Sequence, residues 1–207
     1  MIAVIDYGAG NLSSVVKALT KLGCAPVVTS ERSAIERART LVLPGVGAAG
    51  HAMAALEAIG LKSAIVEAIA RGVPFLGICL GLQILLTTSE ESGGQPCLDV
   101  VPGEVRRLPE GLKVPHMGWN QVHQRRQHQV FCGIPDNSDF YFVHSYYVSP
   151  HDQSTVAGDT EYGVTFCSLL VKNNLVATQF HPEKSGKQGL MLLANFLEFA
   201  GEKAQAG

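Results

Sequence analysis

The first half of the chain alternates short apolar runs with amphipathic stretches, and this alternation constrains the fold more than any other feature. Four runs have the length and residue types of buried strands, within 2–5, 26–29, 41–43 and 73–78. Helical spacing predicts one helix over 12–22, closed by Gly23, and one long helix within 51–70. Strands and helices that alternate in this way predict an α/β fold with a doubly wound, mostly parallel central sheet flanked by helices. Ligands of such folds bind at the carboxyl ends of the strands.

The second half consists of shorter segments, which predict additional antiparallel strands in the C-terminal half. Expected strands fall within 100–108, 114–122, 140–148, 155–157, 162–171 and 175–180. A tight turn at Asn173 and Asn174 precedes the last of them, and a closing helix is expected over 186–199. No linker rich in Pro, Gly or Ser and no internal repeat divides the chain. We therefore expect residues 1–207 to form a single domain, a size within the usual range.

Composition excludes several classes of protein. The net charge is −2 and 46% of the residues are hydrophobic, so no basic excess indicates nucleic acid. No run approaches the roughly 18 apolar residues that a membrane span needs. The five cysteines are scattered and odd in number, which argues against a disulfide framework. The N-terminus enters a strand at once, without a signal-peptide pattern. We expect a cytoplasmic protein without a nucleic-acid or membrane partner.

Cys79 stands at the most informative position of the chain. It follows the apolar run 73–78 and precedes a helix expected over 80–86, with Gly77 and Gly81 on either side. This G-x-C-x-G pattern has the form of the nucleophile elbow G-x-S-x-G, with a thiol in place of the hydroxyl. Glycines there let neighbouring backbone approach, and the N–H groups of the following helix favour a thiolate. The alternative is a buried structural cysteine that only ends a strand.

A second glycine-rich stretch, Gly45 to Gly50, matches the dinucleotide-binding pattern G-x-G-x-x-G. That pattern also needs an acidic residue at the end of the next strand, whereas the next strand here ends in Cys79. The other interpretation is that Pro44 to Gly47 presents backbone N–H groups toward Cys79, as an oxyanion hole requires. A non-catalytic nucleotide-binding module built around Gly45 to Gly50 stays an alternative.

A cysteine nucleophile needs a base, and the base needs a group that orients it. His181 ends the last expected strand, and Pro182 favours an extended backbone at His181. Residues i and i+2 of an extended chain point to the same side, so Glu183 is expected to accept from one ring nitrogen of His181. The other nitrogen would face Cys79. The alternative is a strand-end histidine beside an unrelated exposed glutamate. His116 and His144 are harder to dismiss than the remaining histidines, but neither has an acidic residue close by.

The residues 77–83 together with His181-Pro182-Glu183 resemble the class I (triad) glutamine amidotransferases, and Pro44 to Gly47 resembles the oxyanion segment of that family. Further segments narrow the resemblance to the glutaminase subunits of imidazole glycerol phosphate synthase in histidine biosynthesis: 6–12, 115–120, 141–146 and 180–185. Leu82 supports the narrower match, because anthranilate-type relatives usually carry His there. The resemblance covers essentially the whole chain.

The resemblance implies a mechanism and a set of site residues. Cys79 would attack the side-chain amide of glutamine to form a glutamyl thioester, His181 would protonate the departing ammonia and then activate water, and Glu183 would orient His181. The resemblance assigns the oxyanion hole to Val46, Gly47 and Leu80 and the substrate site to Gln83, Glu91, Ser145 and Tyr146. It implies neither a cofactor nor a metal.

The resemblance also implies a partner, a cyclase subunit that receives the ammonia in a heterodimer. It places the docking surface near Trp119, Asn120, Tyr141 and Lys184. An exposed Trp among polar residues suits an interface, and a core Trp is the alternative. A stand-alone cysteine hydrolase or peptidase of related fold stays a second functional alternative, since it would share the elbow but has no use for Gln83 and Glu91.

Overall fold

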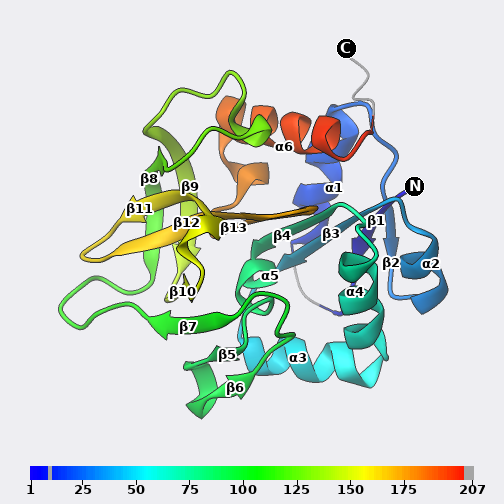
Figure 1. The fold of residues 1–207 in the computed structure, drawn as a ribbon, viewed down its shortest axis with the longest axis horizontal. Coiled ribbons are helices and arrows are strands. Elements are labelled where there is room, and N and C mark those ends of the chain that lie inside the picture. Colours follow the sequence, from blue (N-terminus) through cyan, green and yellow to red (C-terminus); the bar gives the residue numbers. More distant parts are fainter. Residues whose placement is uncertain (9–10, 203–207) are drawn as a thin grey trace.

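A computed structural model describes residues 1–8 and 11–202 of the chain. One large mixed sheet runs through these residues, and helices cover both of its faces (Figure 1). Its main path has the strand order β2-β1-β3-β4-β13-β12-β10-β7-β5-β6, and β8, β9 and β11 join it at the side. The strands are β1 Ile2–Ile5, β2 Val27–Thr29, β3 Thr40–Gly45, β4 Phe75–Cys79, β5 Thr88–Ser89, β6 Gln95–Pro96, β7 Gly103–Arg107, β8 His116–Gln124, β9 Ser138–His144, β10 Tyr146–Pro150, β11 Val156–Glu161, β12 Thr165–Lys172 and β13 Leu175–Thr178.

The helices alternate with the strands of the first half. They are α1 Leu12–Lys21, α2 Arg32–Arg37, α3 Ala49–Ala58, α4 Leu61–Ala70, α5 Leu80–Gln83 and α6 Gly186–Phe199, with short 3₁₀ turns η1 Glu91–Gly93, η2 Gln129–Phe131, η3 Gln153–Thr155 and η4 Pro182–Lys184. In Figure 1, α1 and α6 lie on one face of the sheet, whereas α3 and α4 lie on the other.

Strand pairing confirms the predicted division of the sheet. Strands β2, β1, β3, β4 and β13 pair in parallel with one another, in this order. Most pairs of the C-terminal half are antiparallel, including β12 with β13 and β8 with β9. The register places Gly45 of β3 opposite Cys79 and Thr178 of β13 opposite Ile78. The carboxyl ends of β3, β4 and β13 therefore meet at one edge of the sheet, with Cys79 in the middle.

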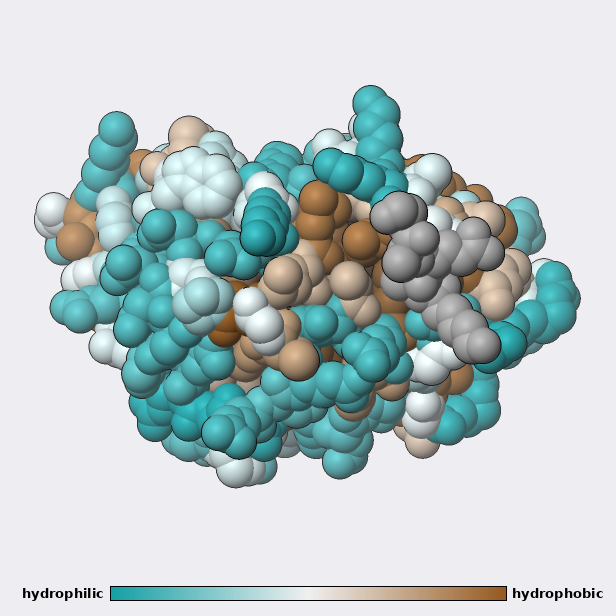
Figure 2. All heavy atoms as spheres, turned by 90° about the horizontal axis from the view of Figure 1, so that it is seen from above, coloured by the Kyte–Doolittle hydropathy of each residue, from teal (hydrophilic) through white to brown (hydrophobic). Residues whose placement is uncertain are grey.

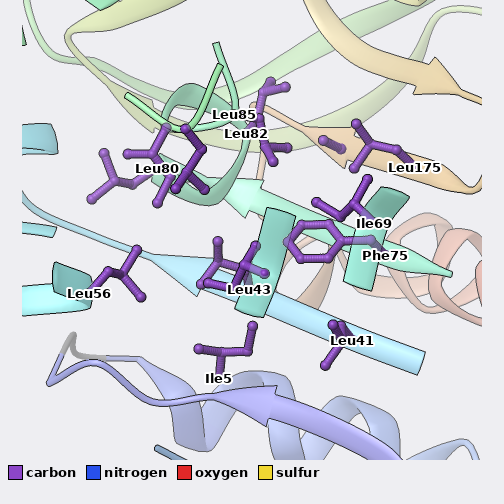
Figure 3. Close-up of a cluster of buried hydrophobic side chains, with 14 of the residues drawn as sticks. Ile5, Leu41, Leu43, Leu56, Ile69, Phe75, Leu80, Leu82, Leu85 and Leu175 are labelled. Atoms are coloured by element: carbon purple, nitrogen blue, oxygen red, sulfur yellow. The ribbon is translucent and has the colours of Figure 1, made fainter. Parts of the chain in front are cut away.

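Two hydrophobic cores explain why the parallel strands are apolar throughout. Alternate residues of a strand point to opposite faces, so Ile5, Leu43 and Phe75 enter one core (Figure 3). Their neighbours Val4, Val42 and Leu76 enter the other core, which packs against α1 and α6. Strands covered on both faces need apolar residues at every position, which is the pattern of the sequence.

Several predicted elements have different limits. The long helix expected within 51–70 is wrong: α3 and α4 are separate helices, because Gly60 adopts φ 68° and its N–H bonds to the carbonyl of Glu57. The strand expected within 140–148 is divided at Ser145 into β9 and β10. The helix after Cys79 ends at Gln83, and α2 was not predicted.

Hydrophilic residues cover most of the face seen in Figure 2, around a central area of hydrophobic residues. Large exposed apolar side chains include Met117 and Trp119 on β8, with 61% and 58% of their surface exposed. Across residues 1–8 and 11–202, every helix is too short or too polar to cross a membrane.

Candidate active site

Cys79 occupies a strained corner between β4 and α5. Its backbone has φ 55° and ψ −106°, a conformation that residues with a side chain rarely adopt. The flanking glycines make this corner possible. A Cβ on Gly81 would collide with the carbonyl oxygen of Leu43 in β3, and a Cβ on Gly77 would lie 2.9 Å from the carbonyl oxygen of Gly81. The G-x-C-x-G pattern therefore marks a site where strand, corner and helix approach more closely than any other residue allows.

His181 reaches this corner because β13 pairs with β4. The backbone of His181 is held by its N–H bond to the carbonyl of Tyr141, 2.9 Å, and its carbonyl accepts from the Ser185 hydroxyl, 2.6 Å. Its ring Nδ1 lies 2.9 Å from Oε1 of Glu183, and the two side chains are 2% and 0% exposed. The predicted contact is present and His181 itself is extended, with φ −100° and ψ 94°, but the extended chain expected to continue to Glu183 is wrong. Residues 182–184 form the 3₁₀ turn η4 instead.

The half-buried Asn11 completes a row of hydrogen-bonded polar groups with Glu183 and His181. Its side-chain Nδ2 donates to Oε1 of Glu183 over 2.8 Å. Glu183 therefore accepts two hydrogen bonds on one oxygen, while its Oε2 has no partner among the described residues. Asn11 belongs to segment 6–12, of which Ala9 and Gly10 lie outside the described residues. Sequence reasoning missed its role, because the two residues are 172 positions apart.

The electrostatics of the site favour a charged His181. Burial lowers the pKa of His181, but the neighbouring Cys79 sulfur, the hydrogen bond to Glu183 and the negative charges of both groups outweigh burial and raise that pKa to about 9. A buried imidazolium between a carboxylate and a thiol is the arrangement that stabilises a thiolate. In the described residues, however, Nε2 of His181 has no hydrogen-bond partner. The Cys79 sulfur instead donates to the carbonyl of Val143 over 3.7 Å. Cys79 and His181 are therefore close enough for the sulfur to raise the pKa of the ring, while the hydrogen bond of the sulfur goes to Val143.

Cys79 opens into a cavity of about 230 Å³. Among the lining residues are the predicted oxyanion and substrate residues Val46, Gly47, Leu80, Gln83, Glu91, Ser145 and Tyr146. The structure thus brings together residues from four distant parts of the chain. His181 and Glu183 are not among the residues that line this cavity.

The two predicted side chains of the substrate site are held by protein contacts. The amide nitrogen of Gln83 donates to the carbonyl of Tyr146, 2.8 Å, and to Oε1 of Gln179, 3.2 Å. Gln179 in turn donates to the sulfur of Cys79 over 3.8 Å. Glu91 accepts a short hydrogen bond from the N–H of Ala49, at the start of α3. Gln179 is a second residue that sequence reasoning missed.

The glycine-rich stretch Gly45 to Gly50 does not have the form of a dinucleotide site. A pyrophosphate would bind at the N-terminus of the following helix, and the carboxylate of Glu91 accepts from the first N–H of α3 there. Gly45 belongs to β3 and lies against the hydroxyl of Tyr7, while Gly47 adopts φ 92° beside Cys79 in the cavity wall. Burial and then the charge of Cys79 raise the pKa of Tyr7, and its hydroxyl has no partner among the described residues.

The residues predicted to bind a partner lie in two groups. Trp119 is exposed and meets Tyr141 edge-on, with 6.0 Å between ring centres, so a core position for this Trp is wrong. Lys184 is exposed in η4. Asn120, in contrast, follows Trp119 on β8 and bonds inward to His116, 3.2 Å, and to the carbonyl of Glu161, 3.0 Å.

Comparisons with known proteins agree on one family. The family model described as "Glutamine amidotransferase class-I" matches residues 3–199. The protein named imidazole glycerol phosphate synthase subunit HisH of Moorella thermoacetica is 54% identical over 206 residues, covering 100% of this chain and 98% of the relative. The protein of the same name from Dehalococcoides mccartyi is 52% identical over 204 residues, covering 98% and 100%.

Solved structures give the same fold at low sequence identity. A crystal structure described as a glutamine amidotransferase has a TM-score of 0.77 and 20% identity, and the match covers 97% of this chain and 100% of that one. A crystal structure described as a glutamine amidotransferase from Thermotoga maritima has a TM-score of 0.67, with 19% identity and coverage of 96% and 82%.

Proposed function

This chain belongs to the class-I glutamine amidotransferase family, and we propose that it is the glutaminase subunit of an imidazole glycerol phosphate synthase in histidine biosynthesis. It hydrolyses glutamine to glutamate and ammonia and delivers the ammonia to a cyclase subunit. Residues 1–207 act as a single glutamine amidotransferase domain. One observation carries the proposal: a strained cysteine lines a cavity and has as its neighbour a histidine that is held by a His–Glu–Asn row of hydrogen bonds.

The chemistry divides between Cys79 and His181. The Cys79 thiol gives its proton to Nε2 of His181 as the sulfur adds to the side-chain amide carbon of glutamine, and the C–N bond breaks as His181 passes that proton to the departing ammonia. Water then adds to the thioester carbon while Nε2 of His181 takes its proton, and the C–S bond breaks to release glutamate as His181 returns that proton to the sulfur. The raised pKa of His181 supports this assignment, because the imidazolium supplies the proton for the first step.

Glu183 and Asn11 do not touch the substrate and act by positioning His181. The Nδ1 of His181 donates to Glu183, so Nε2 is the nitrogen directed at the reaction. Asn11 donates to the same oxygen and fixes the carboxylate. Since the oxygen that holds His181 is itself held, the ring has one orientation.

The cavity wall supplies the other parts of the proposed site. Backbone N–H groups of Val46, Gly47 and Leu80 would stabilise the oxyanion, and loss of one such donor costs about 10²–10³ in turnover. The Glu91 carboxylate would pair with the substrate ammonium, while Gln83 would hold the amino-acid end, with backbone of Ser145 and Tyr146 assisting. Gly47, at φ 92°, can change its peptide orientation more easily than other residues. We place a gate at Pro44 to Gly47 that keeps the free chain nearly inactive.

The partner surface is proposed near Trp119, Asn120, Tyr141 and Lys184. Trp and Tyr are among the side chains that most often anchor protein interfaces, and here the exposed Trp119 packs against the half-buried Tyr141 on the β8–β9 hairpin. The proposed partner is a cyclase subunit, in a heterodimer.

The test uses the chain with and without the cyclase partner and its substrate. Adding both should raise glutamate release steeply. Cys79→Ala should abolish the glutamine-driven reaction but leave cyclisation running on free ammonium salts. His181→Ala should be nearly as severe, and Glu183→Gln milder. The Cys79→Ala/His181→Ala double variant should be no worse than Cys79→Ala, because the two residues share one step.

Three results would contradict the proposal. If free ammonium could not replace glutamine in the cyclase reaction, ammonia delivery would be excluded. An isolated chain with full activity would exclude the gate. If the complex left glutamine intact and cleaved a peptide instead, the stand-alone cysteine hydrolase would be the better interpretation.

A further inference from the structure

Two buried histidines next to the cavity have no part in the proposed mechanism. His116 on β8 and His144 on β9 are paired in the strand register and are both buried. Nδ1 of His116 lies 2.9 Å from Nε2 of His144. The ring of His116 is stacked between Tyr162 and Phe142, with 4.0 and 5.0 Å between ring centres. Both rings are thus fixed, and their nitrogens are directed at each other.

The partners of the pair determine which nitrogens carry protons. Nδ1 of His144 lies 2.9 Å from the carbonyl oxygen of Tyr146, which can only accept, so we assign a proton to that Nδ1. In a neutral ring the Nε2 of His144 is then an acceptor, and Nδ1 of His116 must be the donor to it. His116 therefore offers Nε2 as an acceptor to the amide of Asn120, 3.2 Å away. All three hydrogen bonds therefore run in one direction: Asn120 donates to His116, His116 donates to His144, and His144 donates to the carbonyl of Tyr146.

The amide of Asn120 supports this direction independently. Its Nδ2 also donates to the carbonyl of Glu161, 3.0 Å, and its Oδ1 accepts from the N–H of Gln121, 2.8 Å. The amide orientation is therefore fixed without reference to His116. Burial lowers the pKa of both histidines, to about 3 for His144, which keeps the rings neutral near pH 7.

The row of hydrogen bonds ends in the wall of the cavity. The carbonyl of Tyr146 accepts from His144 and also from Gln83, so both of its lone pairs have a donor. Gln83 bonds onward to Gln179, which donates to the sulfur of Cys79. His144, Tyr146 and Gln83 all line the cavity. The orientation of His144 thus affects the part of the wall predicted to receive glutamine.

We propose that His116 and His144 form a neutral hydrogen-bond relay of fixed direction, from Asn120 to the carbonyl of Tyr146, which positions the glutamine-binding wall of the cavity. This role of the relay rests on the proposed function, whereas its proton positions do not. His116 and His144 are positioning residues, because they act through Tyr146 and Gln83. A disordered relay leaves the Tyr146 carbonyl with one donor and lets the wall shift, so it weakens binding of glutamine more than it slows turnover.

The proton positions are tested directly by NMR of the chain labelled with ¹⁵N-histidine. At pH 7 we expect both His116 and His144 to be neutral, with the proton on Nδ1. A proton on Nε2 of His144, or a charged ring at either position, would overturn the relay. This measurement needs no activity and decides the structural part of the proposal alone.

The functional part is tested with a matched pair of variants in the complex with the cyclase subunit. His144→Asn places an amide where Nδ1 lies and can still donate to Tyr146, whereas His144→Gln places it where Nε2 lies and loses that bond. We expect His144→Gln to raise KM for glutamine about tenfold, the effect of one lost buried hydrogen bond. His144→Asn should stay close to wild type, and kcat should change less than KM in both.

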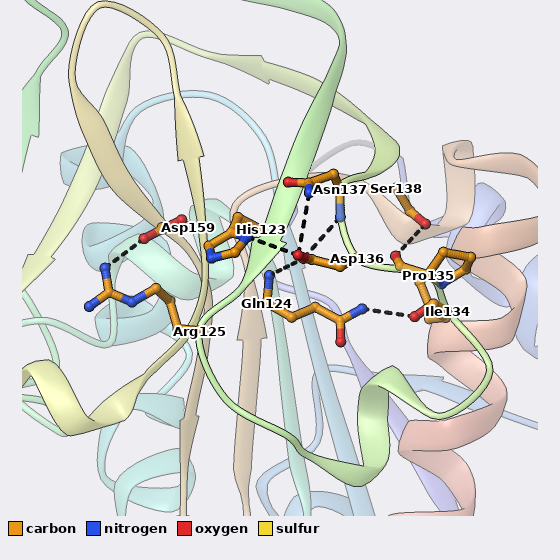
Figure 4. A network of polar contacts seen from close by, with 9 residues as sticks. All are labelled: His123, Gln124, Arg125, Ile134, Pro135, Asp136, Asn137, Ser138 and Asp159. Atoms are coloured by element: carbon orange, nitrogen blue, oxygen red, sulfur yellow. Dashed lines mark hydrogen bonds and ion pairs between the residues drawn. The ribbon is translucent and has the colours of Figure 1, made fainter.

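His123 provides the control on the same strand. It bonds to Asp136 near the surface (Figure 4). It lies toward the opposite end of β8 from His116, so His123→Asn should leave KM and kcat unchanged. Equal KM values for His144→Asn and His144→Gln would overturn the positioning role, even if both variants melt earlier. If the wild-type complex releases no glutamate, the proposed function fails instead, while the NMR result still stands.

Discussion

Asn11 offers the sharpest test of how the site orients its base. It precedes α1 with φ 77°, yet its side chain does not cap that helix. The side chain bonds to Glu183 instead, over 2.8 Å. A hydrogen bond to a charged group contributes about 1.5–3 kcal/mol, and each 1.36 kcal/mol in the barrier is tenfold in rate. If the whole loss falls on the transition state, removal of this amide lowers kcat/KM for glutamine by about 10- to 150-fold.

The substitutions must respect the backbone at this position. Asn11→Gly removes the amide and tolerates the positive φ, so it isolates the lost bond. Asn11→Asp keeps the shape but replaces the donor with a carboxylate oxygen next to Glu183. Two adjacent carboxylates cannot both ionise easily, so one is protonated at low pH and can donate as Asn11 did. The activity of Asn11→Asp relative to wild type should therefore fall as pH rises.

The assay is glutamate release by the complex over a range of glutamine concentrations. Ammonium-driven cyclisation in the same samples serves as the control, because it does not use the triad and should be unchanged. The positioning role of Asn11 would be refuted if Asn11→Gly kept kcat/KM within twofold of wild type. It would also be refuted if Asn11→Asp showed the same pH dependence as wild type.

Three further predictions concern the elbow and its base. A glutamine-analogue electrophile should modify Cys79 alone among the five cysteines, and peptide mapping that places the adduct elsewhere would contradict the assignment. Gly81→Ala should lower the free energy of unfolding by about 3 kcal/mol, because its Cβ would overlap the carbonyl of Leu43. A free energy of unfolding in denaturant equal to that of wild type would contradict this prediction. The pKa of His181 is raised from 6.5 to about 9, so the stability that protonated His181 provides is fully present below about pH 6.5 and is lost as pH rises through about 9. Urea unfolding should show this loss of stability as pH rises, and the loss should be smaller in Cys79→Ala than in wild type. Equal losses in the two proteins would contradict a contribution of Cys79 to the raised pKa.

Sequence patterns predicted the parallel half of the sheet well, because the pattern that indicates each strand lies within the strand itself. Runs that are apolar at every position indicate strands covered on both faces, and β1 has the predicted limits. Breaks inside a continuous pattern are less visible. Gly60 within an apolar helical stretch is compatible with one helix or two, and Ser145 within an alternating run does not show that the strand ends there. Tertiary packing decides both.

The active-site residues likewise divide into those indicated by local sequence and those that depend on tertiary packing. Cys79 and the His181–Glu183 pair were predictable because each depends on neighbours within two residues. Asn11 and Gln179 were not, since they meet their partners only after β4 and β13 have paired. The pairing of His116 with His144 depends on the register of one hairpin, and a shift by a single residue would turn one of them to the other face. No acidic residue accompanies either histidine, because each is the partner of the other.

The resting position of the Cys79 sulfur connects the partner surface to the chemistry. The thiol donates to the carbonyl of Val143, while Nε2 of His181 has no partner among the described residues. Val143 belongs to β9, two residues after Tyr141, and β9 pairs with the strand that carries Trp119. A partner bound to Trp119 and Tyr141 would therefore contact the same hairpin whose Val143 carbonyl accepts from the thiol. We infer that docking releases the thiol to His181. Alkylation of Cys79 should then be faster in the complex than in the free chain, with His123→Asn as an unaffected control, and equal rates would show that the hairpin does not restrain the nucleophile.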